Sequence, residues 1–481
     1  MARQLKSAEA KTSGAIKFGT DGWRAIIAEE FTFANARIVA NAIARYVIRS
    51  EDPRKGVIIG YDHRFSSDTV AAAVAEVISA TGTPVWLTDK PCPTPAVSLL
   101  VRQRKAAGGL VITASHNPYR WNGIKYKASY GSSALPSIVA QIEQELEAVQ
   151  KCEVRALPAR RDLIHSIDPR EPYLDALEKL VDWKRLRQAK FRFVSDPMHG
   201  SASGLLRELF TRNQVACEEI RAERDPRFGG AHPEPIEPHI QPLREAVLGG
   251  EFDAGFCSDG DGDRIGAIDR DGSFLNAHQL FALLVWHLVG TRNLSGEIAK
   301  TFSVTKLIDK IAGKFGRRLH EVPIGFKYIC ELMLEQNILI GGEESGGFGT
   351  SLYLPERDAT VSALFLAELM AWHNKSLGEL LGALHAEFGE YHYGRVDLDV
   401  EPEQKRKAIA HFSCERLSQL LDWPVVRRED MDGIKIYLGD VGWVMVRASG
   451  TENLLRIYCE TSRRETTQQV LTGVKDLVHA L

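Results

Sequence analysis

The chain has 481 residues, and its 60 lysines and arginines nearly balance its 63 aspartates and glutamates, which leaves a net charge of −3. This balance argues against a protein that coats nucleic acid or an anionic membrane surface, and the ordinary content of hydrophobic (44%) and charged (26%) residues excludes disordered and low-complexity classes. At about 100–200 residues per domain, the length predicts three or four domains.

Targeting signals are not evident in the sequence. The first residues are polar and lack the apolar segment of a secretory signal. The longest apolar stretch, 280–289, contains His287 and is about half the length of a membrane-spanning helix, so we expect a buried helix there. Seven dispersed cysteines form no Cys-x-x-Cys pair, which fits free thiols in a reducing compartment. We therefore expect a cytoplasmic protein, monomeric or homodimeric, without a membrane or nucleic-acid partner.

The first third of the chain alternates β-rich and helical runs. Continuous apolar strands between amphipathic helices indicate an α/β unit whose largely parallel sheet is covered on both faces. Strands are predicted at 57–62, 85–89, 108–115 and 124–128, and helices at 69–80 and 137–149.

The same alternation follows twice more, so we expect three similar α/β domains, although no residue-level repeat is visible. Segment 225–242, rich in Pro and Gly, is expected to be a long loop inside the second set. The second set has predicted strands at 191–196, 215–220 and 253–259 and helices near 204–211 and 241–248. The third has predicted strands at 298–304, before Pro323 and at 338–342, and helices after Thr305 and over 327–335.

The order of predicted helices and strands changes after residue 388. Hairpin spacing there predicts an antiparallel sheet and hence an α+β domain. A polar helix is expected over 403–421, strands at 433–439, 442–449 and 454–461, and a final helix from Thr466. The domain count comes to four, with expected boundaries 1–163, 164–273, 274–388 and 389–481.

The segment SDGDGDRIG carries three aspartates that alternate with two glycines directly after an apolar strand. Asp259, Asp261 and Asp263 can converge because glycines let the backbone fold tightly. Carboxylates without His or Cys form a hard-oxygen site suited to Mg²⁺. An EF-hand is excluded, because its sixth position would be Gly and is Arg264, and its twelfth would be Glu and is Arg270. A solvated acidic turn is the alternative.

The segment ITASHNPYRWNGIKYK places Ser115 where an apolar strand ends, the usual position of functional residues in α/β folds. Four polar residues follow Ser115 in the same segment, namely His116, Asn117, Lys125 and Lys127. Because the Gly-x-Ser-x-Gly nucleophile elbow is absent, a nucleophilic Ser115 needs other activation, such as a metal on the group that it attacks. A serine in a turn or helix cap is the alternative.

Two further segments have the composition of binding loops, although a structural loop and a plain β-turn are the alternatives. GGEESGGFG offers two carboxylates and a hydroxyl, which suit hydrogen bonds to the vicinal hydroxyls of a sugar. RASGTENLLRIY offers guanidinium groups, hydroxyls and exposed backbone N–H groups, which suit a phosphate. A cleft between four domains that handles a phosphorylated sugar accounts for all four segments together.

Five motifs, FGTDGWR, TASHNP, DGDGDR, GEESGG and RASGTEN, follow one another in an order and spacing that resemble the α-D-phosphohexomutase superfamily, the phosphoglucomutase/phosphomannomutase enzymes. The resemblance covers nearly the whole chain. It implies three similar α/β domains with mixed sheets and a C-terminal α+β domain around a central cleft. It also implies an intramolecular phosphotransferase that converts a hexose 1-phosphate into a hexose 6-phosphate through phosphoserine and a 1,6-bisphosphate, with glucose 1,6-bisphosphate as activator and intermediate.

The resemblance also implies residue roles. Ser115 would carry the phosphoryl group and contribute, with Asp259, Asp261 and Asp263, to one Mg²⁺ site. The other catalytic residues would be Arg24, His116, Lys125 and Arg264, with Lys125 or His116 as general acid or base. The substrate would be bound by Glu343, Ser345 and Lys327 around the sugar and by Arg447, Ser449, Gly450, Thr451, Asn453 and Arg456 around the distal phosphate.

Substrate preference depends on smaller signals. Many phosphomannomutases and phosphoglucosamine mutases of this superfamily have His two residues after the loop serine, where this chain has Gly347. VPIGFKYI, with Lys327, is similar to phosphoglucomutase loops, although Lys327 as an exposed residue at a helix N-terminus is the alternative. We therefore expect glucose phosphates to be the substrates. Mannose phosphates are the alternative, and glucosamine phosphate is the least favoured of the three. A non-catalytic relative and a phosphatase are the rival functions.

Overall fold

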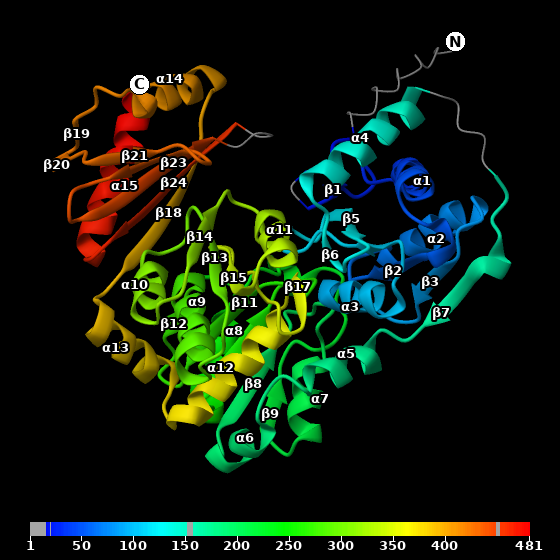
Figure 1. Cartoon of the computed structure of the whole chain (residues 1–481), viewed down its shortest axis with the longest axis horizontal. Helices are drawn as coiled ribbons and strands as arrows, with labels where there is room; N and C mark the ends of the chain where they lie inside the picture. The colour runs from blue at the N-terminus through cyan, green and yellow to red at the C-terminus, as the bar shows by residue number, and fades with distance from the viewer. Residues whose placement is uncertain (1–15, 20, 152–156, 449–452) are drawn as a thin grey trace, which may run out of the picture.

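The computed structural model describes residues 16–19, 21–151, 157–448 and 453–481. Four large sheets follow one another along the chain, and each is built from one continuous stretch of sequence. The first and fourth domains lie at opposite ends of the molecule, with the second and third between them (Figure 1). The expectation of a four-domain α/β protein is therefore confirmed.

The first sheet has the strand order β1-β5-β4-β2-β3-β7, with β6 paired to β5. Strands β4, β2, β3 and β7 run parallel. On the other side, β5 pairs antiparallel with β4, and β1 pairs antiparallel with β5. Because β7 pairs with β3, the sheet extends past the expected boundary at residue 163. The elements are β1 (Trp23–Ile26), α1 (Phe33–Ser50), β2 (Val57–Tyr61), α2 (Ser67–Ala80), β3 (Val85–Thr88), α3 (Thr94–Arg104), β4 (Gly108–Ile112), β5 (Trp121–Ala128), β6 (Ser132–Ser133), α4 (Pro136–Lys151) and β7 (Ile164–Ile167).

The second and third sheets repeat one topology. Their orders are β9-β8-β10-β11-β12 and β14-β13-β15-β16-β17. In both, the first three strands are parallel, the fourth pairs antiparallel with the third, and the fifth pairs antiparallel with the fourth. The second domain has α5 (Arg170–Leu177), α6 (Trp183–Ala189), β8 (Arg192–Asp196), α7 (Leu205–Arg212), β9 (Ala216–Glu219), α8 (Gln241–Gly250), β10 (Ala254–Ser258), β11 (Ile265–Asp269) and β12 (Phe274–Leu275). The third has α9 (Ala277–Trp286), β13 (Glu297–Thr301), α10 (Leu307–Lys314), β14 (Leu319–Val322), α11 (Phe326–Glu335), β15 (Ile338–Gly342), β16 (Phe348–Thr350), β17 (Leu354–Arg357), α12 (Ala359–His373) and α13 (Leu377–Phe388).

The fourth domain is an antiparallel sheet, β18-β24-β23-β22-β21, with α14 and α15 packed on one face. The helix expected over 403–421 is shorter in the structure and ends at Ser413. Leu420, which the expected helix included, lies instead in the short β19–β20 pair and packs into the core of this domain. The elements are β18 (His392–Asp399), α14 (Pro402–Ser413), β19 (Gln419–Leu420), β20 (Trp423–Pro424), β21 (Arg427–Glu429), β22 (Ile434–Tyr437), β23 (Gly442–Ala448), β24 (Leu454–Thr461) and α15 (Arg464–Ala480).

The first three domains share a continuous apolar core. One cluster contains buried side chains of α3 from the first domain, α7 from the second and α9 from the third. Helix α12 is buried along nearly its whole length, as expected for a helix that packs against neighbours on all sides. The fourth domain joins the third through a small separate cluster around Phe302 and Trp443. No helix among the described residues is long and apolar enough to cross a bilayer.

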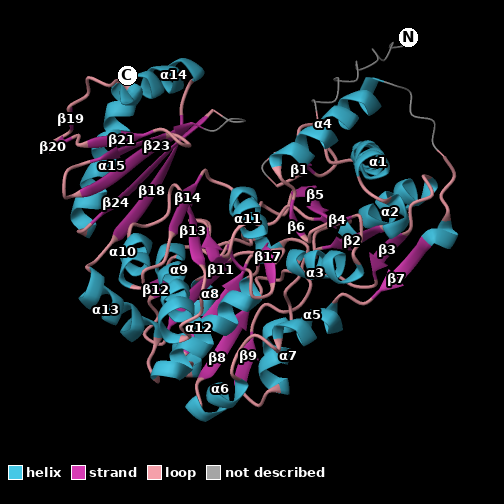
Figure 2. Ribbon diagram, viewed as in Figure 1, coloured by secondary structure: helices cyan, strands magenta, loops and turns pink. Residues whose placement is uncertain are grey.

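Three equivalent loops define the region of interest. In each of the first three domains, the third strand of the repeat (β4, β10 or β15) ends in a loop that leads to an antiparallel fourth strand. These loops contain Ser115, the three aspartates and the GEESGG segment. The strands and their connecting loops can be followed in Figure 2. The fold thus brings three of the four chemically distinctive segments to one place.

Candidate active site

Ser115 lies three residues beyond β4 and is fully buried. Its backbone φ is 53°, a left-handed conformation that is uncommon for any residue other than glycine. Its Oγ donates a hydrogen bond to Asp259 Oδ2 (2.8 Å), and its N–H donates to Thr113 Oγ1 (2.9 Å). A residue held in such a conformation by its surroundings is typical of functional sites.

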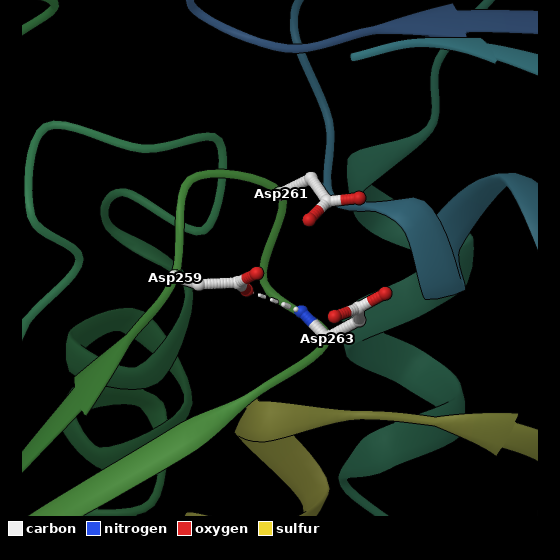
Figure 3. Close-up of side chains that lie close together, drawn as sticks. All are labelled: Asp259, Asp261 and Asp263. Atoms are coloured by element: carbon white, nitrogen blue, oxygen red, sulfur yellow. Dashed lines mark hydrogen bonds between the residues drawn. The ribbon is translucent and has the colours of Figure 1, made fainter. Parts of the chain in front are cut away.

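Asp259, Asp261 and Asp263 converge in the turn between β10 and β11 (Figure 3). All three are fully buried, and one carboxylate oxygen from each lies within 4.8 Å of the others. The turn is fixed by Asp259 Oδ1, which accepts hydrogen bonds from the N–H groups of Asp263 (2.9 Å) and Arg264 (3.2 Å). Gly262 adopts a φ of 72° in the same turn, which explains the need for glycine there.

The aspartate cluster fits a divalent cation. The Oδ1 atoms of Asp261 and Asp263 are buried and have no hydrogen-bond partner within the described structure. Burial and the charges of the two neighbouring aspartates raise the pKa of Asp259 well above its usual range. Buried carboxylate oxygens without a partner are costly, and a hard cation such as Mg²⁺ would satisfy them.

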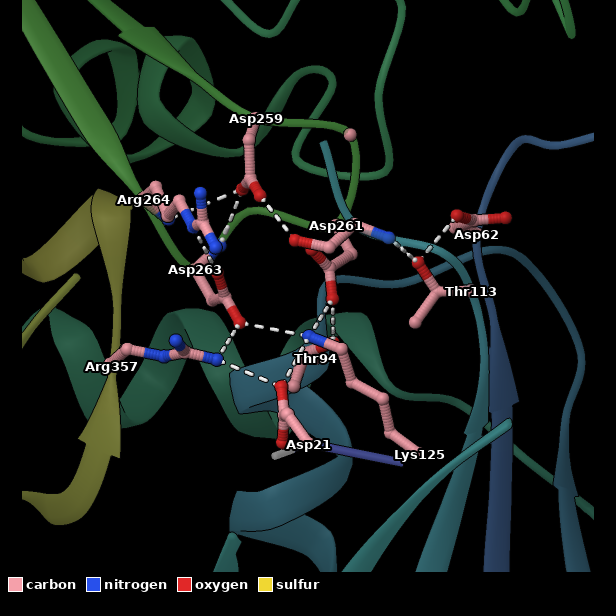
Figure 4. Close-up of polar contacts among 12 residues, drawn as sticks. Asp21, Asp62, Thr94, Thr113, Lys125, Asp259, Asp261, Asp263, Arg264 and Arg357 are labelled. Atoms are coloured by element: carbon pink, nitrogen blue, oxygen red, sulfur yellow. Dashed lines mark hydrogen bonds and ion pairs between the residues drawn. The ribbon is translucent and has the colours of Figure 1, made fainter. Parts of the chain in front are cut away.

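Two cations on different domains are paired with this cluster (Figure 4). Lys125 Nζ lies 2.7 Å from Asp261 Oδ2 and 3.0 Å from Asp263 Oδ2. Arg357 Nη2 lies 2.7 Å from Asp263 Oδ2, and both cations also contact Asp21 Oδ2, at 3.0 and 2.9 Å. Burial lowers the pKa of Lys125, but the surrounding carboxylates outweigh it and leave that pKa above its usual range. Lys125 is therefore protonated in this arrangement.

The other candidate catalytic residues lie around the serine loop. Arg24 Nη1 donates to Asn117 Oδ1 (2.7 Å), and Arg264 Nη1 lies 3.8 Å from Glu234 Oε1. Burial, followed by the charges of Arg264 and Arg24, lowers the pKa of His116 well below its usual range. Its Nδ1 is buried without a partner among the described residues. A neutral imidazole next to the buried serine can accept a proton.

The GEESGG loop contacts the aspartate turn directly, because Ile265 N donates to Gly346 O (3.0 Å). Glu343 is buried and accepts a hydrogen bond from Arg357 Nη1 (3.0 Å). Burial raises the pKa of Glu343 to about 7. Ser345 Oγ is buried and has no partner among the described residues. An unpaired hydroxyl and a carboxylate at one loop are groups that can bind sugar hydroxyls.

The remaining candidate residues lie further from the serine. Lys327 is half-buried in the first turn of α11, with its Nζ 5.3 Å from the centre of the Tyr328 ring. Arg447, at the end of β23, donates to Asp432 Oδ1 (2.7 Å), and Arg456 Nε lies 3.6 Å from Asp397 Oδ2. Asn453 is exposed. The expected phosphate-binding residues Ser449, Gly450 and Thr451 lie outside the described residues.

Two residues of the site were missed from the sequence. Arg357 touches carboxylates of the first, second and third domains, namely Asp21, Asp263 and Glu343. Nothing in its neighbourhood, LPERDA, distinguishes it from a surface charge. Asp21 had a signal, because it belongs to the same FGTDGWR motif as Arg24.

Comparison with known families agrees with this arrangement. Models of phosphoglucomutase/phosphomannomutase alpha/beta/alpha domains I, II and III match residues 15–153, 171–272 and 276–388, and the model of the C-terminal domain matches 410–477. The chain belongs to the phosphoglucomutase/phosphomannomutase family. Members of this family are mutases that move a phosphoryl group between positions of a sugar, so the expectation of a mutase enzyme is confirmed.

Individual relatives in the phosphoglucomutase/phosphomannomutase family carry different names. A phosphoglucomutase/phosphomannomutase of Thermococcus kodakarensis is 30% identical over 96% of this chain and 99% of its own length. A phosphoglucosamine mutase of a Synechococcus species is 30% identical over 97% of this chain and 96% of its own. The crystal structure of a candidate phosphomannomutase of Thermus thermophilus matches with a TM-score of 0.86 at 33% identity, covering 97% of this chain and 100% of that one. Family membership therefore leaves the sugar open.

Proposed function

We propose that this phosphohexomutase interconverts glucose 1-phosphate and glucose 6-phosphate and that Ser115 carries the phosphoryl group. The observation that carries the proposal is the position of Ser115 Oγ, buried and 2.8 Å from Asp259 in a cluster of carboxylates and cations. In phosphoryl transfer the protein mainly positions the reactants and stabilises charge on the transferring oxygens.

Asp259, Asp261, Asp263 and the phosphoryl group on Ser115 would hold Mg²⁺, which supplies neutralisation of negative charge there. The substrate's free hydroxyl oxygen attacks the phosphorus of phosphoserine, the bond to Ser115 Oγ breaks, and a hexose 1,6-bisphosphate results. After this intermediate has turned round, Ser115 Oγ attacks the other phosphorus and the product hydroxyl leaves.

Protons must leave the attacking hydroxyl and return to the leaving oxygen. His116 is neutral and can accept a proton, but its lowered pKa makes it a weak base. Lys125 is protonated and can donate a proton or stay as a positive charge. Arg24 and Arg264, whose charges both act on His116, serve as further positive charges near the transferring group.

The far end of the substrate has its own residues in this proposal. Glu343 and Ser345 bind sugar hydroxyls, with Lys327 beside them. The distal phosphate is bound in the fourth domain by Arg447, Ser449, Gly450, Thr451, Asn453 and Arg456. The bisphosphate can then bind to these residues in either orientation, because both of its ends carry a phosphate.

The preference for glucose phosphates rests on Gly347. A Cβ atom at this position would lie 2.3 Å from Arg357 Cδ, so the arginine occupies the space that a larger side chain would need. The histidine that the resemblance associates with mannose and glucosamine enzymes has no room here. The relatives named phosphoglucosamine mutase favour the competing sugar, so the assay must include it.

The test is a coupled assay with Mg²⁺, a trace of glucose 1,6-bisphosphate and the 1-phosphates of glucose, mannose and glucosamine. We expect the largest kcat/KM for glucose 1-phosphate, and a higher value for another sugar would overturn the preference. Release of inorganic phosphate without isomerisation would support a phosphatase instead. Intact-mass measurement should show a phosphoryl adduct that is lost in Ser115→Ala, and an adduct that survives in this variant refutes the role of Ser115.

A further inference from the structure

Arg64 lies in the loop between β2 and α2 and is fully buried. A guanidinium group has five N–H donors in a planar fork. In Arg64 they make five hydrogen bonds, none longer than 3.1 Å. The acceptors are Asp62 Oδ2 and the backbone carbonyl oxygens of Ser115, Asn117, Pro118 and Trp121.

Three of these acceptors belong to the loop that carries Ser115 and His116, and the fourth, Trp121 O, belongs to the first residue of β5, which follows this loop. Arg64 Nη2 alone reaches the carbonyl oxygens of Ser115 (2.5 Å) and Asn117 (2.7 Å), on either side of His116. One buried side chain therefore determines where the carbonyl groups of the loop point. Lysine could not do the same, because its ammonium group has three donors and no planar fork.

A second set of contacts holds the N–H of Ser115. Thr113 Oγ1 accepts this N–H and donates its own proton to Asp62 Oδ2 at 2.6 Å (Figure 4). Asp62 is in turn fixed by Arg64 and by Ser67 Oγ, which donates to Asp62 Oδ1 (2.8 Å). The N–H and the C=O of Ser115 are thus both tied to the Asp62–Arg64 pair, and this explains how a serine keeps a φ of 53°.

Arg64 also contacts the second domain. Its guanidinium carbon lies 4.8 Å from the centre of the Phe228 ring, in the loop between β9 and α8. The same loop supports the aspartate turn, because Gly260 N donates to Pro233 O (3.2 Å). The two catalytic loops approach closely here, since a Cβ atom at Gly260 would lie 2.6 Å from the carbonyl oxygen of Ser115.

We propose that Arg64, together with Asp62 and Thr113, is a positioning lock that holds Ser115 in its left-handed conformation and seats the serine loop against the aspartate turn. The proposal rests on the proposed role of Ser115. In-line transfer needs reacting atoms in near-attack geometry, and a displacement of about 1 Å costs on the order of 100-fold in rate. The hydrogen bonds of the lock reach neither the GEESGG loop nor the described residues of the fourth domain, so substrate binding should not depend on it.

Arg292 provides a matched control. It too is an arginine that donates to a backbone carbonyl (Leu180 O, 2.9 Å), lies near a carboxylate (Glu368 Oε2, 3.4 Å) and sits over an aromatic ring (Phe365, 5.6 Å). It belongs to the third domain and contacts none of the three catalytic loops through these bonds. Arg292→Lys therefore reports the general cost of replacing such an arginine.

The experiment compares Arg64→Lys, Arg292→Lys and the unmodified chain in the mutase assay and in the rate at which glucose 1,6-bisphosphate phosphorylates Ser115, followed by intact mass. For Arg64→Lys we expect kcat and the phosphorylation rate to fall together by about 100-fold, with KM changed less than about twofold. Arg292→Lys should lower thermal stability and keep kcat. An unchanged kcat in Arg64→Lys, an equal loss in both variants, or a change confined to KM overturns the proposal.

If Arg64→Lys does not fold, Thr113→Val tests the same lock, since valine keeps the shape of threonine and removes its hydroxyl. We expect the same selective loss of kcat, and an unchanged kcat in this variant contradicts the lock. A failure of the proposed function has a different signature, because the unmodified chain would then show neither isomerisation nor a phosphoryl adduct on Ser115.

Discussion

Glu343 gives the sharpest test of how the site's electrostatics work. This residue is only 6% exposed, and burial raises its pKa to about 7 although Arg357 Nη1 lies 3.0 Å away. Glu343→Gln keeps the shape of the side chain and removes the titration. Arg357 retains two other carboxylate partners, Asp21 and Asp263, so the exchange does not leave the guanidinium unpaired.

The sign and size of the effect follow from linkage. The pKa of Glu343 rises from 4.5 to about 7 on folding, so the unfolded chain loses its proton first as the pH increases. Stability contributed by the protonated form is fully present below pH 4.5 and is lost as the pH rises to about 7. At 1.36 kcal/mol per pKa unit, the ionised carboxylate costs about 3 kcal/mol above that range.

The assay is urea unfolding of both proteins between pH 5 and 8.5, without Mg²⁺ or substrate. We expect the free energy of unfolding of Glu343→Gln to exceed that of the unmodified chain by an amount that grows with pH and levels off near pH 8. A difference that stays constant across this range would falsify the reasoning. The same exchange at Glu335, exposed in the same domain, should change stability little at any pH.

The activity of the unmodified chain should rise with pH, whereas its stability falls. The ionised carboxylate is the form that accepts hydrogen bonds from sugar hydroxyls, so kcat/KM of the unmodified chain should rise as the pH passes through about 7. Glu343→Gln should be less active and should lose this limb of the profile. A variant with the same limb would show that another group produces it.

Three further outcomes are expected. Asp261→Asn removes one carboxylate of the triad, so activity should fall at least about 100-fold and no longer respond to Mg²⁺ added after chelation, whereas the unmodified chain should recover. Gly260→Ala places a Cβ atom 2.6 Å from the carbonyl oxygen of Ser115, so kcat should fall about 10-fold or more with KM retained, as initial rates will show. Arg357→Gln leaves Asp263 and Glu343 short of a cation, and urea unfolding should show a loss of about 3 kcal/mol.

The fold was largely predictable because its parallel strands are buried on both faces and read as continuous apolar runs. The strand expected at 454–461 corresponds to β24, and the runs at 57–62 and 338–342 correspond to β2 and β15. The helices that were not anticipated are α1, α3, α5, α6, α12 and α13. The helix expected over 403–421 was too long. The local sequence does not reveal that Leu420 forms part of strand β19 and packs into the core of the fourth domain.

The site was predictable only where a segment concentrates unusual chemistry. The aspartate triad is conspicuous because it places three carboxylates in five residues, and the structure brings it to within a hydrogen bond of Ser115. Arg357 and Arg64 carry no such signal. Their roles come from tertiary contacts with residues far away in the chain, and a single charged side chain in a short strand or loop looks the same whether it faces solvent or a buried carboxylate.

The charges of the site nearly balance one another, as do those of the whole chain. Five carboxylates (Asp21, Asp259, Asp261, Asp263 and Glu343) lie among four cations (Arg24, Lys125, Arg264 and Arg357). A buried cluster of this kind tolerates little excess of either sign, because uncompensated charges are costly away from water. A divalent cation and a phosphoryl dianion added together leave the balance unchanged, whereas either one alone would disturb it. In the proposed mechanism, a phosphoserine and its metal ion would together complete the electrostatics of the site.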